Sequence, residues 1–132
     1  MKKLFNMEIK LFNKLLSKTL SKETQDSLVQ KKLDWILACC SIEKVILFGS
    51  ACSYEMTDSS DIDLILIFQD KKSLDLNKIA LYKNRPQDDW PHDLIFHTLE
   101  SYNKSVDSGG GAAYIAHKEG RVIYNRGNKH ES

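Results

Sequence analysis

The stretch LFGSACSYEMTDSSDIDLILIF, residues 47–68, decides the fold that we predict for this chain. Residues 44–48 are rich in strand formers and stop at Gly49, and residues 61–68 form a second apolar run. The small polar residues between the two runs leave room for a single helical turn. Because residues 61–68 carry apolar side chains on both faces, we expect a central strand that is covered on both sides.

Helices and two further strands are predicted around this pair. Apolar spacing and end signals indicate helices over 3–20, 21–38 (capped by Ser21), 73–84, 99–107 and 112–118, and strands over 92–97 and 121–124. This order predicts an α+β (mixed α/β) domain with a small mixed sheet of about four strands flanked by helices. We divide the chain into a helical N-terminal extension (1–40), a core domain (41–126) and a disordered tail (127–132).

The composition is that of a soluble globular protein, with 42% hydrophobic and 28% charged residues among 132. The formal net charge is only +1, so we do not expect a dedicated nucleic-acid binder. Charged residues interrupt the apolar residues near the start, so we expect no signal peptide, no membrane span and a cytoplasmic location. Cys39, Cys40 and Cys52 lack zinc-ligand spacing and are expected to be free, buried or half-buried thiols.

Asp61 and Asp63 are the first candidates for chemistry. Residues two apart in a strand point to the same side, so the two carboxylates should lie side by side at the start of a buried strand. Like charges at this spacing resist ionisation, and a bound cation removes the repulsion. Carboxylate oxygens are preferred ligands of Mg²⁺, which also takes phosphate oxygens. The alternative is a solvated pair at a strand end.

Asp93 begins another predicted strand and shares a face with His97. If this strand lies beside that of Asp63, Asp93 completes a group of three carboxylates that suits a two-metal site. The alternative is a solvated strand start. Asp88 and Asp89 compete for the same role, although both precede Pro91 in a predicted loop. His97 either lines the site or is a packed or solvated histidine.

Gly49 and Ser50 lie where the first strand ends. Glycine allows a sharp turn and close approach of a ligand, and we expect Ser50 to cap the short helix that follows. The N–H groups of such a turn can bind a phosphate. By itself, however, a strand followed by Gly-Ser is also a common structural turn.

Together these motifs resemble the nucleotidyltransferase superfamily typified by DNA polymerase beta. Gly-Ser is followed after ten residues by Asp-x-Asp, and a third Asp lies on a later strand. Within that superfamily the chain is similar to the small stand-alone MNT-domain nucleotidyltransferases, in residues 47–68 and in IAHKEGRVIYN at 115–125. The likeness covers roughly 42–125 and implies the nucleotidyltransferase fold.

The resemblance implies a role for each site residue. Gly49 and Ser50 would bind the β- and γ-phosphates of ATP or another nucleoside triphosphate. Asp61 and Asp63 would hold Mg²⁺, or Mn²⁺ in its place, and Asp93 would be a metal ligand or the base that activates the acceptor. The implied reaction is attack of a hydroxyl on the α-phosphorus with release of pyrophosphate, which transfers AMP when ATP is the donor.

The resemblance also implies a protein partner. Small members of this kind resemble the antitoxin of HEPN/MNT toxin–antitoxin pairs, which implies transfer of AMP to a tyrosine of the toxin. The apolar stripe of Phe5, Phe12 and Leu16 would then be a partner or homo-oligomer surface, unless it packs on the protein's own core.

Two other functions stay open. The family often has an Arg directly after Gly-Ser and a Gly a few residues later, where this chain has Ala51 and Tyr54. These departures remove a phosphate contact and alter the turn, so they favour a binding module that neutralises its partner by contact. The third hypothesis is an antibiotic nucleotidyltransferase, which the short chain disfavours because it leaves little room for an acceptor domain.

Overall fold

One mixed sheet organises residues 18–128, the part of the chain that the computed structural model describes. Its strands, in the order β3-β2-β1-β4, are His92–Thr98, Ile62–Phe68, Lys44–Phe48 and Arg121–Asn125. β1 is antiparallel to both β2 and β4, whereas β2 and β3 are parallel. The central β2 is almost wholly buried, as expected from its apolar residues on both faces.

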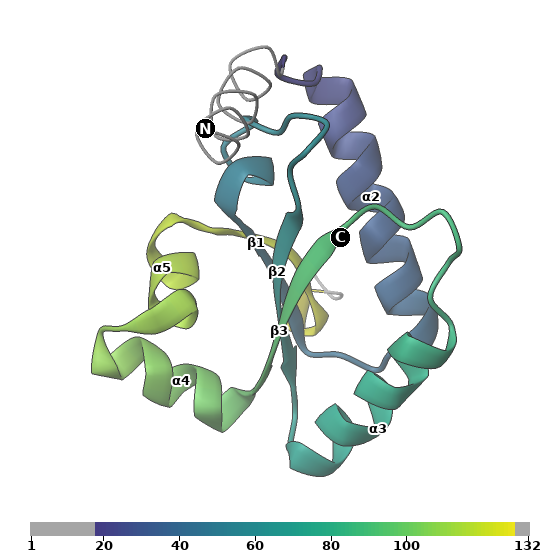
Figure 1. The fold of residues 1–132 in the computed structure, drawn as a ribbon. Coiled ribbons are helices and arrows are strands. Elements are labelled where there is room, and N and C mark those ends of the chain that lie inside the picture. Colours follow the sequence, from purple (N-terminus) through teal and green to yellow (C-terminus); the bar gives the residue numbers. More distant parts are fainter. Residues whose placement is uncertain (1–17, 129–132) are drawn as a thin grey trace, which may run out of the picture.

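Helices cover both faces of the sheet, as Figure 1 shows. One face carries α2 (Lys22–Cys39) and α3 (Lys71–Lys83), and the other carries α4 (Leu99–Ser108) and α5 (Gly111–Glu119). Two short 3-10 helices, η1 (Gly49–Ala51) and η2 (Arg126–Asn128), follow β1 and β4. The Ser21 side chain accepts a hydrogen bond from the N–H of Thr24, which confirms the predicted cap of α2.

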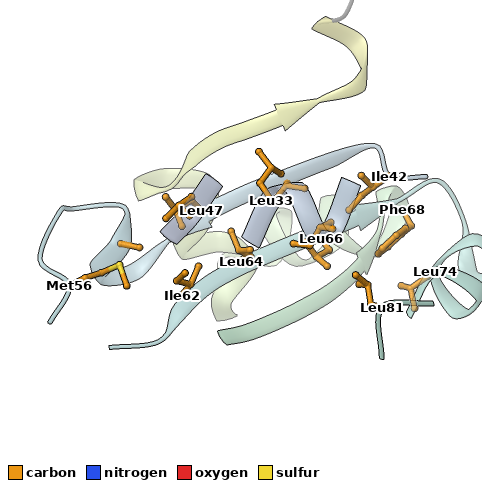
Figure 2. Close-up of a cluster of buried hydrophobic side chains, with 14 residues drawn as sticks. Leu33, Ile42, Leu47, Met56, Ile62, Leu64, Leu66, Phe68, Leu74 and Leu81 are labelled. Atoms are coloured by element: carbon orange, nitrogen blue, oxygen red, sulfur yellow. The ribbon is translucent and has the colours of Figure 1, made fainter. Parts of the chain in front are cut away.

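The larger of two hydrophobic clusters lies between the sheet and the helices α2 and α3. Figure 2 shows its labelled members projecting from both strands and helices into one interior. α2 contributes Val29, Leu33 and Ile36, so this helix shares its core with the sheet. Met56 is fully buried beneath the segment that links η1 to β2, which anchors this segment to the core. The smaller cluster joins the other face of the sheet to α4 and α5.

The predicted fold class is confirmed: an α+β fold with a four-stranded mixed sheet flanked by helices. For the helices and strands predicted after residue 20, the predicted and observed ends differ by at most two residues. The predicted helix over 3–20 lies mostly outside the described residues, and its described end, residues 18–20, is not helical. The end of the predicted tail beyond residue 128 also lies outside the described residues. No helix among the described residues has the length and apolar content needed to cross a membrane.

Candidate active site

The parallel pairing of β2 with β3 brings the key carboxylates together. Asp63 is the register partner of Asp93, so these residues lie on neighbouring strands at the same edge of the fold. Because side chains alternate along a strand, both point to the face that also carries Ile65 and Ile95. Asp61 lies one residue before β2, at the same end. Sequence spacing predicts that Asp61 lies near Asp63, but the position of Asp93 beside Asp63 depends on the pairing of β2 with β3.

Asp63 is the central carboxylate of this group, because its pKa is affected by both of the others. Burial raises the pKa of the Asp63 carboxyl, and the neighbouring charges of Asp93 and Asp61 raise that pKa further. Asp63 is half-buried, whereas Asp61 and Asp93 are exposed. The three carboxylates therefore repel one another, and a positive charge between them would relieve the repulsion.

Gly49 closes the site from the neighbouring strand. β1 ends opposite β2 with Phe48 paired to Asp63, and Gly49 follows with φ at 72°. This left-handed conformation suits glycine. A Cβ at Gly49 would also overlap the Oδ2 atom of Asp63, so the turn needs a residue without a side chain to pass the carboxylate. The expected sharp turn at Gly49 is therefore present.

The expected cap at Ser50 is wrong. η1 begins at Gly49, so Ser50 lies inside the helical turn and Phe48 occupies the cap position without a side-chain hydrogen bond. The turn is held by its backbone instead, because the N–H groups of Cys52 and Ser53 both donate to the Gly49 carbonyl. The hydroxyl of Ser50 is thus not needed to cap the helix.

The chemistry of the donor set fits Mg²⁺, although the carboxylates are not gathered around a common point. Among residues 18–128, no group of three or more His, Cys, Asp or Glu side chains is arranged so that it could hold a metal ion. The side chains of Asp61 and Asp93 are exposed, so they can turn toward Asp63 without disturbing the core. Hard carboxylate oxygens are the donors that Mg²⁺ prefers. A bound cation would also offset the burial and the neighbouring charges that raise the pKa of Asp63.

Comparisons with known proteins identify the family and the fold of this chain. A family model described as "Polymerase beta, Nucleotidyltransferase" matches residues 31–129, which include all four strands. The chain belongs to the polymerase beta nucleotidyltransferase family. The structure is also similar to that of a candidate nucleotidyltransferase from Sulfolobus solfataricus, with a TM-score of 0.53 and 17% sequence identity, over 85% of this chain and 94% of that one. This second likeness concerns the fold. No curated protein matches the chain significantly.

Both departures from the family's usual turn are built into the fold. Ala51 is buried in the large cluster, so this position offers no side chain to a phosphate. Tyr54 has a φ of 60°, which is unusual for a residue other than glycine. Its hydroxyl donates to Asp26 of α2 and accepts from Arg121 of β4, and these contacts hold the strained turn.

A hollow of about 380 Å³ opens beside Gly49. Its walls come from Gly49, from the residues just after η1 (Cys52, Ser53 and Glu55), and from Glu119 at the end of α5. This volume is within the range of small-molecule sites. Because the hollow adjoins the glycine turn, a nucleotide held at the turn would have space on this side.

A buried lysine positions the start of β3, and the sequence analysis missed this residue. Lys32 of α2 is 2% exposed, and its ammonium donates to Asp89, to the Trp90 carbonyl and to Nδ1 of His92. Burial lowers the pKa of Lys32, and the Asp89 carboxylate opposes that change. Asp93 is the next residue after His92, so these contacts fix the backbone that carries it.

The same network decides between the rival acids. Burial raises the pKa of Asp89, but the hydrogen bond and charge of Lys32, together with contributions from Arg85 and His92, leave that pKa below its ordinary value. Asp89 is thus an ion-pair partner, and Asp88 is an exposed residue beside Lys31. A sequence signal for Lys32 did exist, because it lies three residues after Val29 and four before Ile36 on the apolar side of the helix.

His97 is a packed histidine, which is one of the two interpretations offered by the sequence. It pairs with Ile67 near the far end of β3, and its Nδ1 lies 2.9 Å from the Ser101 hydroxyl. Burial lowers its pKa. The three cysteines are free and half-buried, as expected.

Replacing Gly49 with alanine should separate the two reasons for this glycine. Gly109 is the matched control because its φ is 76° but nothing lies near an added Cβ. We expect each alanine to cost about 1–2 kcal/mol through its positive φ. Only Gly49→Ala should also displace the Asp63 carboxylate, and it should therefore abolish the stabilisation by Mg²⁺ that is expected if this carboxylate binds the ion. Denaturation curves with and without Mg²⁺ check this, and equal responses of the two variants would contradict the contact.

Proposed function

We propose that this family member is an Mg²⁺-dependent enzyme that transfers AMP from ATP to a hydroxyl group of a partner protein. The observation that supports this most is the register pairing of Asp63 with Asp93 beside the Gly49 turn. It places two acidic residues on neighbouring strands beside a glycine turn, whose backbone a phosphate chain can approach closely. Asp61, Asp63 and Asp93 would hold Mg²⁺, which supplies charge neutralisation to the phosphates when bound.

The residues of the chain have distinct parts in the proposed reaction. Gly49 and Ser50 bind the β- and γ-phosphates through the N–H groups of their turn, since the first N–H groups of a helix have no partner within it. Asp93 accepts the proton of the attacking hydroxyl. The acceptor oxygen then bonds to the α-phosphorus, the bond from that phosphorus to the bridging oxygen breaks, and pyrophosphate leaves. Catalysis of this kind rests on positioning and charge stabilisation.

A macromolecular acceptor is favoured by the exposure of the site. Asp61 and Asp93 are both exposed, so a side chain of another protein can reach this edge. We propose a HEPN-type toxin as this partner, with the chain acting as its antitoxin in the cytoplasm. This assignment of the partner rests on the resemblance to small MNT-domain proteins.

The decisive experiment follows the label from ATP. The full chain is co-expressed with the protein encoded by the adjacent gene and incubated with Mg²⁺ and ATP labelled at either the α- or the γ-phosphate. We expect label on the partner from α-labelled ATP and in pyrophosphate from γ-labelled ATP. Absence of transfer from all four α-labelled nucleotides would contradict the proposal, and label on the partner from the γ position would indicate phosphorylation instead.

A contact-only antitoxin is the second candidate, supported by the buried Ala51 and the constrained Tyr54. The variant Asp63→Asn distinguishes the two functions, because it removes a proposed metal ligand at the edge of the fold. If Asp63→Asn neutralises the partner as well as the wild type does, contact is sufficient. Turnover of an aminoglycoside or lincosamide by the isolated chain would instead support the antibiotic-modifying alternative.

A further inference from the structure

An exposed apolar stripe runs along α3, on the side of this helix that faces away from the sheet. Leu76, Ile79 and Tyr82 are 61%, 53% and 64% exposed, although Leu74 and Leu81 of the same helix are buried. Within residues 18–128, the other large exposed apolar side chains are scattered singly over three different elements: Leu99, Ile115 and Val122. Single exposed apolar residues are ordinary, whereas several on one helix face are typical of an interaction surface.

Two lysines flank this stripe. Lys72, Leu76, Ile79 and Lys83 follow one another at intervals of four, three and four residues, which places them in one row along the helix. The lysines are thus separated by roughly 16 Å at 1.5 Å per residue. Among the described residues, neither has a carboxylate within ion-pairing distance. The exposed Asp75 carboxylate, one turn before Ile79 on the same face, is paired with Lys71 at 2.9 Å. Within the described residues, the surface therefore has a largely apolar centre and an unpaired positive charge at each end.

We propose that this face of α3 docks an amphipathic helix of a partner protein that carries acidic residues about eleven positions apart on either side of apolar ones. The apolar residues would pack on Leu76, Ile79 and Tyr82, and the acidic residues would meet Lys72 and Lys83. An apolar helix face read at intervals of three and four residues is a recurring mode of recognition. Charge complementarity selects the partner and its register.

The same charges argue against other occupants. A second copy of the chain would bring its own Lys72 and Lys83 against the first pair, which is unfavourable. An anionic membrane is usually recruited by larger basic clusters, and the net charge of this chain is only +1. α3 follows the end of β2 remote from Asp63, so a helix bound there leaves the acidic edge accessible. This docking does not depend on nucleotidyl transfer.

A peptide-binding experiment with the full chain tests the proposal. The probe is a fluorescent 18-residue helical peptide with two pairs of glutamates eleven positions apart and leucines between them. Its controls are the same peptide with lysines for glutamates and a scrambled peptide. We expect anisotropy to show binding of the glutamate peptide at least tenfold tighter than of either control. Charge reversal in Lys72→Glu/Lys83→Glu should transfer the preference to the lysine peptide.

Single substitutions locate the site. Ile79→Ser should weaken binding at least tenfold, whereas Ile115→Ser, a matched change at an isolated exposed isoleucine of α5, should not. Both sites are on the surface, so thermal unfolding should show that the variants remain folded. The proposal would be overturned if the scrambled peptide bound equally well or if no peptide bound. It would also be overturned by a wild-type dimer in sedimentation that Ile79→Ser dissociates, or by binding to phosphatidylserine vesicles in place of the peptide.

Discussion

Replacing Asp63 with asparagine is expected to reduce nucleotidyl transfer by more than about a hundredfold and, in metal-free buffer, to raise the melting temperature. Removing a residue that hydrogen-bonds to a metal ligand lowers metal affinity or activity by roughly 10–100-fold. Removing a proposed ligand itself should lower transfer by more than that. The rise in stability follows from the raised pKa of Asp63, which reflects burial and the charges of Asp93 and Asp61. Asparagine has nearly the same shape but cannot carry that charge.

The sign of the stability change depends on pH. Because the folded-state pKa of Asp63 is raised, the folded chain binds this proton more tightly than the unfolded chain does. The protonated carboxyl thus favours the folded state. Its contribution to the free energy of unfolding is lost as pH rises from the ordinary pKa of an aspartate through the raised pKa of Asp63. Above that window the wild type carries the full cost of ionising Asp63, and Asp63→Asn should remove it. Below the window the two proteins should unfold alike.

Three measurements check the Asp63 prediction: transfer of α-labelled nucleotide, melting temperature against pH without metal, and the shift on adding Mg²⁺. Asp58→Asn is the matched control, because Asp58 is an exposed carboxylate in the segment just before β2. We expect Mg²⁺ to stabilise the wild type and Asp58→Asn but not Asp63→Asn. Full transfer by Asp63→Asn would refute the ligand role, whereas an unchanged melting temperature would refute the electrostatic account alone.

The second large effect is expected at Lys32, where substitution by methionine should reduce the free energy of unfolding by about 3 kcal/mol or more. Methionine is similar in length but cannot donate to Asp89, Trp90 or His92. Removing one partner of a buried ion pair leaves the other charge desolvated, which costs more than the pair contributes. Asp89 keeps a hydrogen bond from Arg85, which offsets part of that cost.

The neighbouring lysine provides the control. Lys31 pairs with Asp88 at 3.4 Å, but the two side chains are 65% and 81% exposed. Lys31→Met should therefore cost less than about 1 kcal/mol. Urea denaturation of both variants measures the difference. Equal stabilities would mean that the Lys32 network adds nothing beyond packing. Because the network fixes the residue before Asp93, Lys32→Met should also lower transfer under conditions where it remains folded.

The local elements of this fold could be predicted from sequence because each depends on neighbouring residues. The Gly49 turn, the buried run of β2 and the cap at Ser21 follow from backbone freedom, alternation and side-chain capping. The cap predicted at Ser50 was wrong because the helical turn begins at Gly49, which puts the cap position two residues earlier at Phe48, and the turn is closed by its backbone. Shifts of one or two residues at helix ends are the ordinary limit of local patterns.

By itself the sequence placed Asp63 at the start of a buried strand beside a glycine turn, with Asp61 two residues before it, although Asp61 lies just outside that strand. Only the tertiary structure decided that Asp93 pairs with Asp63, because the parallel register of β2 and β3 joins residues thirty positions apart. It also decided that Lys32 is buried against Asp89 rather than solvated. A charge can remain inside only when a distant partner compensates its desolvation, and the identity of that partner is a result of folding.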